Sequence, residues 1–244
     1  MDIYTVIAVF LASTLACVVT TIGIYVIGKH EEWGRRNTVY FISFAAGVLI
    51  TVSFIHLIPK SFSMNIHASL YLLAGFMGLY LFNRLITIFV CHKFGSSNLS
   101  IGIIPTLGIG FHSFLDGIIY SVTFNVSIFT GVLAAIGMVL HEFPEGIVTF
   151  LLLEKGGLKK KHASTTAFLA AAITTPLGTL VSFPIIQHIS RSSLGALLAL
   201  SAGALVYVGA SHLLPAVERE EKRYTLISLA SGILVAVIIV MSKV

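Results

Sequence analysis

Two short motifs with the same spacing place a histidine and a carboxylate inside apolar sequence. The first runs from His112 to Asp116, and the second runs from His141 to Glu145. In each motif the two residues are four positions apart, so on a helix they lie on one face. Imidazole and carboxylate together suit Zn²⁺, Fe²⁺, Mn²⁺ or Co²⁺ and not Na⁺ or K⁺. The two motifs therefore predict a four-ligand site for a divalent transition-metal ion.

Each motif has a further polar residue directly after its histidine, Ser113 in the first and Glu142 in the second. Asp116, Glu142 and Glu145 are the only carboxylates deep inside apolar sequence, and no Lys or Arg near them offers a counter-ion. Charges in the bilayer interior are costly, and a bound cation is the simplest compensation. The alternative, that these groups only join helices by hydrogen bonds, leaves the carboxylates unpaired. We interpret Ser113 and Glu142 as a second, weaker metal position beside the first.

The sequence around the motifs is that of a membrane protein. Of its 244 residues 57% are hydrophobic and 10% are charged, whereas soluble domains carry about 25% charged residues. Apolar runs of about 20 residues, enough to cross the hydrocarbon core, recur eight times. Because each run is continuously apolar and not alternating, we expect an all-α membrane protein with eight transmembrane helices. We place these helices at 3–28, 38–59, 68–90, 102–124, 127–153, 164–186, 193–214 and 224–242.

Basic residues are distributed unevenly between the predicted loops. Most lie in or beside the loops that follow the odd-numbered helices, namely Lys29, Arg35, Arg36, Arg84, Lys93, Lys155, Lys159, Lys160, Lys161, Arg219, Lys222 and Arg223. The other side has only Lys60, Arg191 and Lys243. Cytoplasmic loops carry an excess of Lys and Arg, so we expect both chain termini outside. The same distribution explains the net charge of +5 without a nucleic-acid partner, which we do not expect.

Two segments of the sequence resemble each other. Over the fifteen positions from Ala45 to Pro59 and from Ser201 to Pro215, seven residues are identical, including His56 and His212. Five crossings separate the two segments, so they run in opposite directions, as in the inverted repeats of transporters. We interpret His56 and His212 as residues of an ion pathway, with interfacial caps of helix ends as the alternative.

The repeat predicts how the chain is organised. We expect one transmembrane domain over residues 1–244 in a 3+2+3 arrangement. Residues 1–92 and 164–244 form the two three-helix repeats, and residues 102–153 form the central metal-binding helix pair. The matched motifs in the central pair predict a pseudo-two-fold axis in the membrane plane between its two helices.

With these eight spans, this arrangement and the motifs HSFLDG and HEFPEG, the chain resembles the ZIP family (Zrt-, Irt-like proteins) of divalent-metal transporters over essentially its whole length. The resemblance implies metal transport toward the cytoplasm, a binuclear centre between the fourth and fifth spans, a homodimer, and a place in the plasma membrane. The metal is then cargo, so we expect no cofactor. Zn²⁺ is the first expected ion, with Fe²⁺, Mn²⁺, Co²⁺ and Cd²⁺ as alternatives.

The sequence departs from the family pattern at two positions. Ser113 stands where the family usually has Asn. Thr175, directly before Pro176, stands where members of the bacterial type often have a Glu that contributes to the second metal position. Neutral hydroxyls hold divalent cations less well than carboxylates. We therefore expect one tightly bound metal ion and at most one loosely bound ion per chain.

Two other classes of function use similar residues. A zinc-dependent intramembrane hydrolase of the ceramidase or progestin-receptor-like type would use histidine, aspartate and serine, and His112, Ser113, Asp116 and His141 offer them. Those folds have seven spans and no inverted repeat, so we expect a transporter and not an enzyme. A metal sensor that does not transport is the third alternative.

Overall fold

The computed structural model describes residues 3–94, 98–218 and 222–241, and this part of the chain contains helices and no strand. Seven helical segments in it are long and apolar enough to cross a membrane. An eighth apolar helix, α11 (Thr225–Met241), is shorter, with 17 residues. The chain is therefore an all-α integral membrane protein, as the apolar runs predict.

The helical segments follow the predicted spans in order. Four of the long segments are single helices, α1 (Ile3–Lys29), α4 (Ala68–Phe94), α5 (Asn98–Val126) and α6 (Ile128–Lys155). Each of the other three is interrupted by a π-helical turn. In the second span η1 (Ser53–Leu57) separates α2 (Glu31–Val52) from α3 (Ile58–Phe62), and in the sixth span η2 (Phe168–Ala172) separates α7 (Lys160–Ala167) from α8 (Thr174–Ile186). In the seventh span η3 (Val208–Leu213) separates α9 (Arg191–Tyr207) from α10 (Leu214–Glu218). Two of the three π-helical turns, η1 and η3, lie in the two segments that resemble each other in sequence.

Several helices extend beyond the apolar runs. The clearest case is α2, which begins at Glu31 and not at residue 38, so that His30 alone separates it from α1. Glu31 and Glu32 occupy the first turn of α2, where negative charge is favourable beside the helix dipole. The predicted start at residue 38 was too late because hydropathy marks the hydrocarbon core and not the end of the helix.

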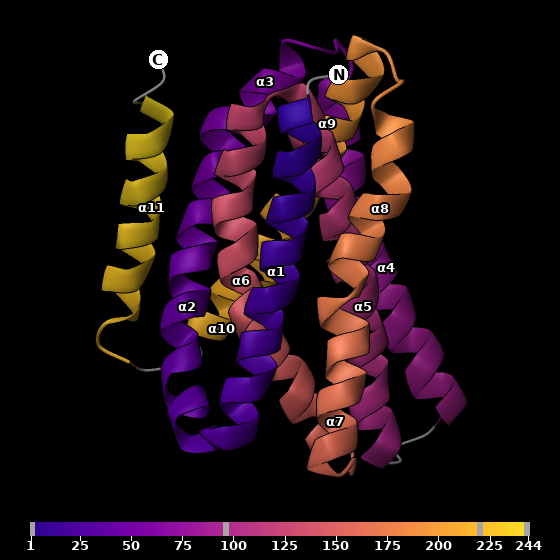
Figure 1. Cartoon of the computed structure of the whole chain (residues 1–244), viewed down its shortest axis with the longest axis vertical. Helices are drawn as coiled ribbons and strands as arrows, with labels where there is room; N and C mark the ends of the chain where they lie inside the picture. Colours follow the sequence, from indigo (N-terminus) through magenta and orange to yellow (C-terminus); the bar gives the residue numbers. More distant parts are fainter. Residues whose placement is uncertain (1–2, 95–97, 219–221, 242–244) are drawn as a thin grey trace.

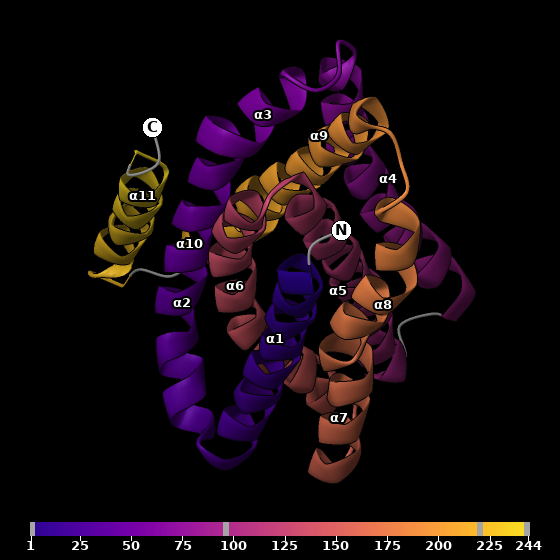
Figure 2. The same cartoon turned by 45° about the horizontal axis from the view of Figure 1, so that its top comes forward.

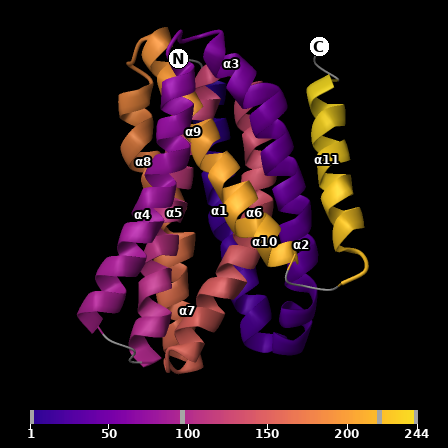
Figure 3. The same cartoon turned by 180° about the vertical axis from the view of Figure 1, so that it is seen from behind.

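The helices form one bundle around the central pair α5 and α6. Figures 1 and 2 show α6 and α1 between α2 on one side and α8 on the other. Figure 3 shows α4 and α11 at opposite edges of the bundle, where α4 packs on α9 and α11 packs on α2. The start of α1 and the end of α11 lie at the same end of the bundle (Figure 1), as an even number of crossings requires.

The central pair is a tight helical hairpin. Ser127 alone separates α5 from α6, and its hydroxyl caps α6 by accepting a 3.0 Å hydrogen bond from the backbone N–H of Thr130. A side chain at the N-cap that accepts such a bond stabilises a helix start by about 1 kcal/mol. One buried apolar cluster packs around the hairpin near this turn, with Leu133 and Met138 among its members. A second cluster, with Ile147 and Phe150, packs near the other end. The two motifs lie between these clusters.

Glycines set how closely the central helices approach their neighbours. A Cβ atom at Gly146 in α6 would lie 2.3 Å from the carbonyl oxygen of Thr20 in α1. A Cβ atom at Gly117 in α5 would lie 2.1 Å from the carbonyl oxygen of Thr175 in α8. Any side chain at either glycine would therefore push two helices apart. Helix association in lipid depends on such close van der Waals packing, so these contacts hold α1 against α6 and α8 against α5 at the level of the motifs.

Candidate metal centre

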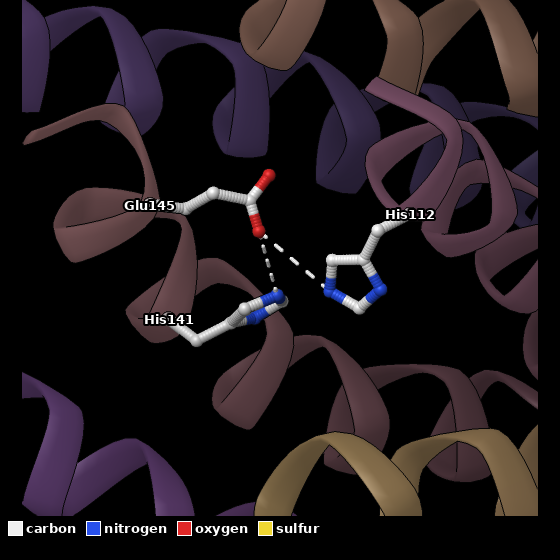
Figure 4. Close-up of side chains that lie close together, drawn as sticks. All are labelled: His112, His141 and Glu145. Carbon is white, nitrogen blue, oxygen red and sulfur yellow. Dashed lines mark ion pairs between the residues drawn. The ribbon is translucent and has the colours of Figure 1, made fainter. Parts of the chain in front are cut away.

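The two motifs face each other across the central hairpin. Oδ2 of Asp116 lies 3.1 Å from Nε2 of His141 and 3.6 Å from Nε2 of His112. Oε2 of Glu145 lies 3.6 Å from Nε2 of each histidine. Figure 4 shows His112 pointing from α5 toward His141 and Glu145 on α6. One potential ligand atom from each of these three residues lies within 4.8 Å of the others, and the Asp116 carboxylate borders the group.

The four side chains are buried to different degrees. The side chains of Asp116 and His141 are 1% and 3% exposed, whereas those of His112 and Glu145 are 18% and 9% exposed. The centre is therefore least covered at His112 and Glu145, one residue from each helix. The four side chains come together as the spacing predicted, and their role as metal ligands stays a prediction.

Several buried polar atoms of this centre have no hydrogen-bond partner. Both carboxylate oxygens of Asp116 and both ring nitrogens of His141 lack a hydrogen-bond partner among the described residues. Of these atoms, Oδ2 of Asp116 and Nε2 of His141 approach each other to 3.1 Å as an ion-pair contact. Leaving such a group unsatisfied costs about 1–3 kcal/mol, and more when it is charged. A divalent cation between the imidazoles and the carboxylates would satisfy these atoms, so the donor set fits the predicted ligand.

Ser113 and Glu142, the residues of the predicted second position, have protein partners instead. The Ser113 hydroxyl lies within hydrogen-bonding distance of Oε1 of Glu145, to which it donates, and of the carbonyl oxygen of Ile109 at 2.9 Å. The bond to Glu145 leaves Oε2 of that carboxylate facing the two histidines. Glu142 is fully buried and accepts one hydrogen bond at each carboxylate oxygen. Oε2 accepts from Thr20 at 2.5 Å, and Oε1 accepts from Thr175 at 3.0 Å.

Sequence reasoning missed Thr20. It lies in the first span, 122 positions before Glu142, and is one of many small residues in an apolar run. A signal exists in hindsight, because Thr20 precedes Gly23 by the same three positions that separate Thr175 from Gly178. An alignment of the first span with the sixth therefore pairs the two threonines. Together they form a clamp on the Glu142 carboxylate, called the threonine clamp below.

The two candidate pathway histidines lie in π-helical turns. His56 is part of η1 and His212 is part of η3. Nε2 of His56 lies 3.1 Å from the Thr130 hydroxyl at the start of α6, and its ring packs edge-on against Phe129. The side chain of His212 lies outside the part that the structure describes. Single π-helical turns inside α-helices occur frequently at functional sites, and a pathway role for both histidines stays a prediction.

The chain is similar to known metal transporters. The family model described as "ZIP Zinc transporter" matches residues 91–240. The "Metal cation symporter ZIP14" of Xenopus tropicalis is 32% identical over 117 residues, which cover 48% of this chain and 24% of that protein. The human protein of that name is 30% identical over 110 residues, with 45% and 22% covered. The human "Zinc transporter ZIP4" is 32% identical over 111 residues, with 46% and 17% covered.

The matched stretch spans about a quarter or less of the length of these relatives. The family model nevertheless covers more than half of the chain and includes both motifs and the last three spans. The paired motifs, the apolar helices that carry them and this match agree with one another. The chain belongs to the ZIP zinc transporter family.

Proposed function

We propose that this chain carries divalent transition-metal ions across the membrane toward the cytoplasm, through the centre formed by His112, Asp116, His141 and Glu145. The observation that carries the proposal is the meeting of two imidazoles and two carboxylates inside a membrane-spanning hairpin, with polar atoms on Asp116 and His141 that have no hydrogen-bond partner among the described residues. Membership of the ZIP family supports metal as the substrate. The ion is cargo and not a resident cofactor.

The ligand set orders the candidate ions. Two imidazole nitrogens with two carboxylate oxygens suit Zn²⁺ best, and Fe²⁺, Mn²⁺, Co²⁺ and Cd²⁺ are the alternatives. The set contains no thiolate or thioether, which Cu⁺ would require. Zn²⁺ also agrees with the printed name of the ZIP4 relative, and a broader range agrees with that of the ZIP14 relatives.

Transport accounts for the site better than hydrolysis. In a hydrolase the Ser113 hydroxyl would act on a substrate, but here it faces Glu145 and the carbonyl oxygen of Ile109. The relatives are named as a symporter and a transporter. We therefore propose that the chain is not an enzyme.

Helix packing supports the proposed 3+2+3 arrangement of residues 1–92, 102–153 and 164–244. The packing of α1 on α6 corresponds to that of α8 on α5, and the packing of α11 on α2 corresponds to that of α4 on α9. In the packing of α11 on α2 and of α4 on α9, a glycine at the matching position lies at each helix contact. A Cβ at Gly47 would lie 2.4 Å from the carbonyl oxygen of Leu229, and one at Gly203 would lie 2.1 Å from that of Leu72. An inverted repeat predicts such pairs.

The proposal extends to orientation, membrane and assembly. The distribution of basic residues supports both termini outside the cell, and the family resemblance supports a homodimer in the plasma membrane. Single cysteines between residues 156 and 161 should react with an impermeant reagent only after the cells are opened. Labelling from outside intact cells would show that the chain has the opposite orientation. The mass of the chain in lipid nanodiscs tests the homodimer, and a single-chain mass would exclude it under those conditions.

Uptake into proteoliposomes tests the function directly. Reconstituted chain should take up Zn²⁺, and Fe²⁺, Mn²⁺, Co²⁺ or Cd²⁺ in the same assay should compete to the extent that each is a substrate. Protein-free liposomes are the control, and a parallel assay should find no hydrolysis of ceramide or peptide. Hydrolysis without uptake would overturn the proposal in favour of the enzyme, whereas metal binding without uptake would favour a sensor.

A further inference from the structure

Tyr120 is a buried residue that the proposed site does not yet use. It lies in α5 four positions after Asp116, so it continues the helix face that carries His112 and Asp116. The residue is 0% exposed and is among the largest fully buried side chains. Its hydroxyl has no hydrogen-bond partner among the described residues. Buried tyrosine hydroxyls usually have one, so this phenol requires an explanation.

The direction of the Tyr120 side chain follows from helix geometry. Long side chains on a helix lean back toward its N-terminus, over the residue one turn earlier. One turn rises about 5.4 Å, a distance that a tyrosine side chain can span, and the residue one turn earlier is Asp116. We therefore expect the hydroxyl to point back along α5 toward Asp116, on the helix face that carries both motif residues.

Three residues of the hairpin carry buried polar atoms without a hydrogen bond. Within the described part of the chain, the buried side-chain oxygens and nitrogens without a partner belong to Asp116, His141 and Tyr120. The corresponding position on α6 is different. Thr149 follows Glu145 as Tyr120 follows Asp116, and its hydroxyl donates a 2.7 Å hydrogen bond to the Glu145 carbonyl oxygen of its own helix. The unpaired hydroxyl is thus specific to the α5 side of the centre.

We propose that Tyr120 is a positioning residue of the metal centre, whose hydroxyl donates a hydrogen bond to the Asp116 carboxylate when an ion is bound. The ion then binds one oxygen of that carboxylate and the phenol binds the other. This proposal rests on the proposed function, because it requires a cation beside Asp116. Ions that depend more on oxygen ligands, such as Mn²⁺, depend more on Tyr120 than Zn²⁺ does, since imidazole suits Zn²⁺.

The variant Tyr120→Phe removes only the hydroxyl and keeps the ring in the core. The matched control is Tyr207→Phe, because Tyr207 is also buried but its hydroxyl accepts a 3.2 Å hydrogen bond from Nδ2 of Asn83, outside the centre. Metal affinities of the full chain in detergent are measured from the thermal stabilisation by Zn²⁺ and by Mn²⁺, which grows with the logarithm of ion concentration over Kd. The chain has eight tyrosines, so the phenol of Tyr120 is reported by the difference in metal-induced tyrosine absorbance between the unmodified chain and Tyr120→Phe.

For Tyr120→Phe we expect unchanged or higher stability without metal, because an unpaired buried hydroxyl is removed. Affinity should fall about tenfold for Mn²⁺ and about threefold for Zn²⁺, since a hydrogen bond to a charged group is lost. The metal-induced absorbance change should be smaller than in the unmodified chain. Tyr207→Phe should lower stability without metal and leave both affinities and the absorbance change as they are.

His141→Ala separates the two proposals. Metal affinities of Tyr120→Phe equal to those of the unmodified chain, with binding lost in His141→Ala, would overturn the role of Tyr120 and leave the proposed function standing. Unchanged binding in His141→Ala would overturn the proposed function itself. A Tyr120→Phe variant that is less stable without metal, or does not fold, would show that the phenol already has a partner in the protein, and this too would overturn the inference.

Discussion

The two halves of the central hairpin have the same frame and different side chains. In each, a histidine precedes a carboxylate by four positions, and a glycine follows that carboxylate. Gly117 and Gly146 both meet the carbonyl oxygen of a threonine on a neighbouring helix. The residue after the histidine differs, because Ser113 donates a hydrogen bond into the centre whereas Glu142 accepts two from the threonine clamp.

The difference shows how a symmetric backbone supports an asymmetric site. The shared frame brings the candidate ligands together, so it must be present on both helices. The residue after the histidine does not need to be the same, and here it places an additional buried carboxyl group on α6 only. Exposure is asymmetric as well, since the His112 side chain is 18% exposed and that of His141 is 3% exposed. The more exposed histidine lies on α5, whereas the more exposed carboxylate, Glu145, lies on α6.

The largest expected effect tests whether the two histidines are equivalent. His141→Ala should weaken Zn²⁺ binding by more than about 100-fold, because even residues that only orient a ligand contribute 10–100-fold. His112→Ala should cost less, because water can replace a ligand that is already partly exposed. The measurement is equilibrium dialysis of the detergent-solubilised chain with Zn²⁺. The control is His162→Ala, an exposed histidine in α7, and equal losses in His112→Ala and His141→Ala would show that exposure does not matter.

The next effect tests the shared frame. Gly117→Ala and Gly146→Ala should each lower the free energy of unfolding by at least about 2 kcal/mol, because overpacking at a helix crossing has no room to relax. Gly108→Ala, also in α5, is the matched control because nothing lies within 4 Å of a Cβ there. It should raise stability by about 0.5–1 kcal/mol. Unfolding of the chain by SDS in mixed micelles measures all three, and similar values for them would contradict the close crossings.

The next prediction concerns the affinity of the second metal position, which a substitution in the threonine clamp should change. Thr175→Glu places a second carboxylate beside Glu142, whose Oε1 now accepts a 3.0 Å hydrogen bond from Thr175. Like charges at this distance repel unless a cation lies between them, so a loose second metal position should become tighter while the first changes little. Thr175→Gln adds the same bulk without charge and should not have this effect. Two equally tight Zn²⁺ ions per unmodified chain would contradict the expectation that Thr175 weakens the second position.

The smallest expected effect concerns the hydrogen bond that Ser113 on α5 donates to Glu145 on α6. Ser113→Ala removes the donor to Glu145, whose Oε2 lies 3.6 Å from both histidines. The carboxylate then gains freedom to turn, and Zn²⁺ affinity should fall about threefold to tenfold. Ser121→Ala, on the same helix but bonded to the carbonyl oxygens of Gly117 and Thr179, is the control. An unchanged affinity in Ser113→Ala would show that Glu145 does not need this bond.

The fold and the cluster at the centre were predictable for a physical reason. Hydropathy identifies helices that lipid requires, and positions four apart on one helix share a face whatever surrounds it. His112 with Asp116, and His141 with Glu145, are therefore local relationships that the sequence contains directly. The ends of helices were less predictable, as the early start of α2 at Glu31 shows.

The surroundings of the centre were not predictable in the same way. Thr20 reaches Glu142 from a span far away in sequence, and no local pattern marks which side of α1 faces α6. Ser113 was interpreted as a weak metal ligand, and its bond to Glu145 depends on how far apart α5 and α6 lie. Such contacts are set by helix packing, which is fixed in turn by the glycines at the crossings.

The single-residue turn at Ser127 has a consequence for how the protein is made. The hairpin that it closes is local in sequence, and local contacts form faster than distant ones. All four side chains of the centre have been synthesised once the ribosome has passed Glu145, whereas Glu142 must wait for Thr175 on the sixth span before the second of its two hydroxyl partners exists. During synthesis, the centre is therefore complete in composition before the carboxylate beside it has both of its hydrogen bonds.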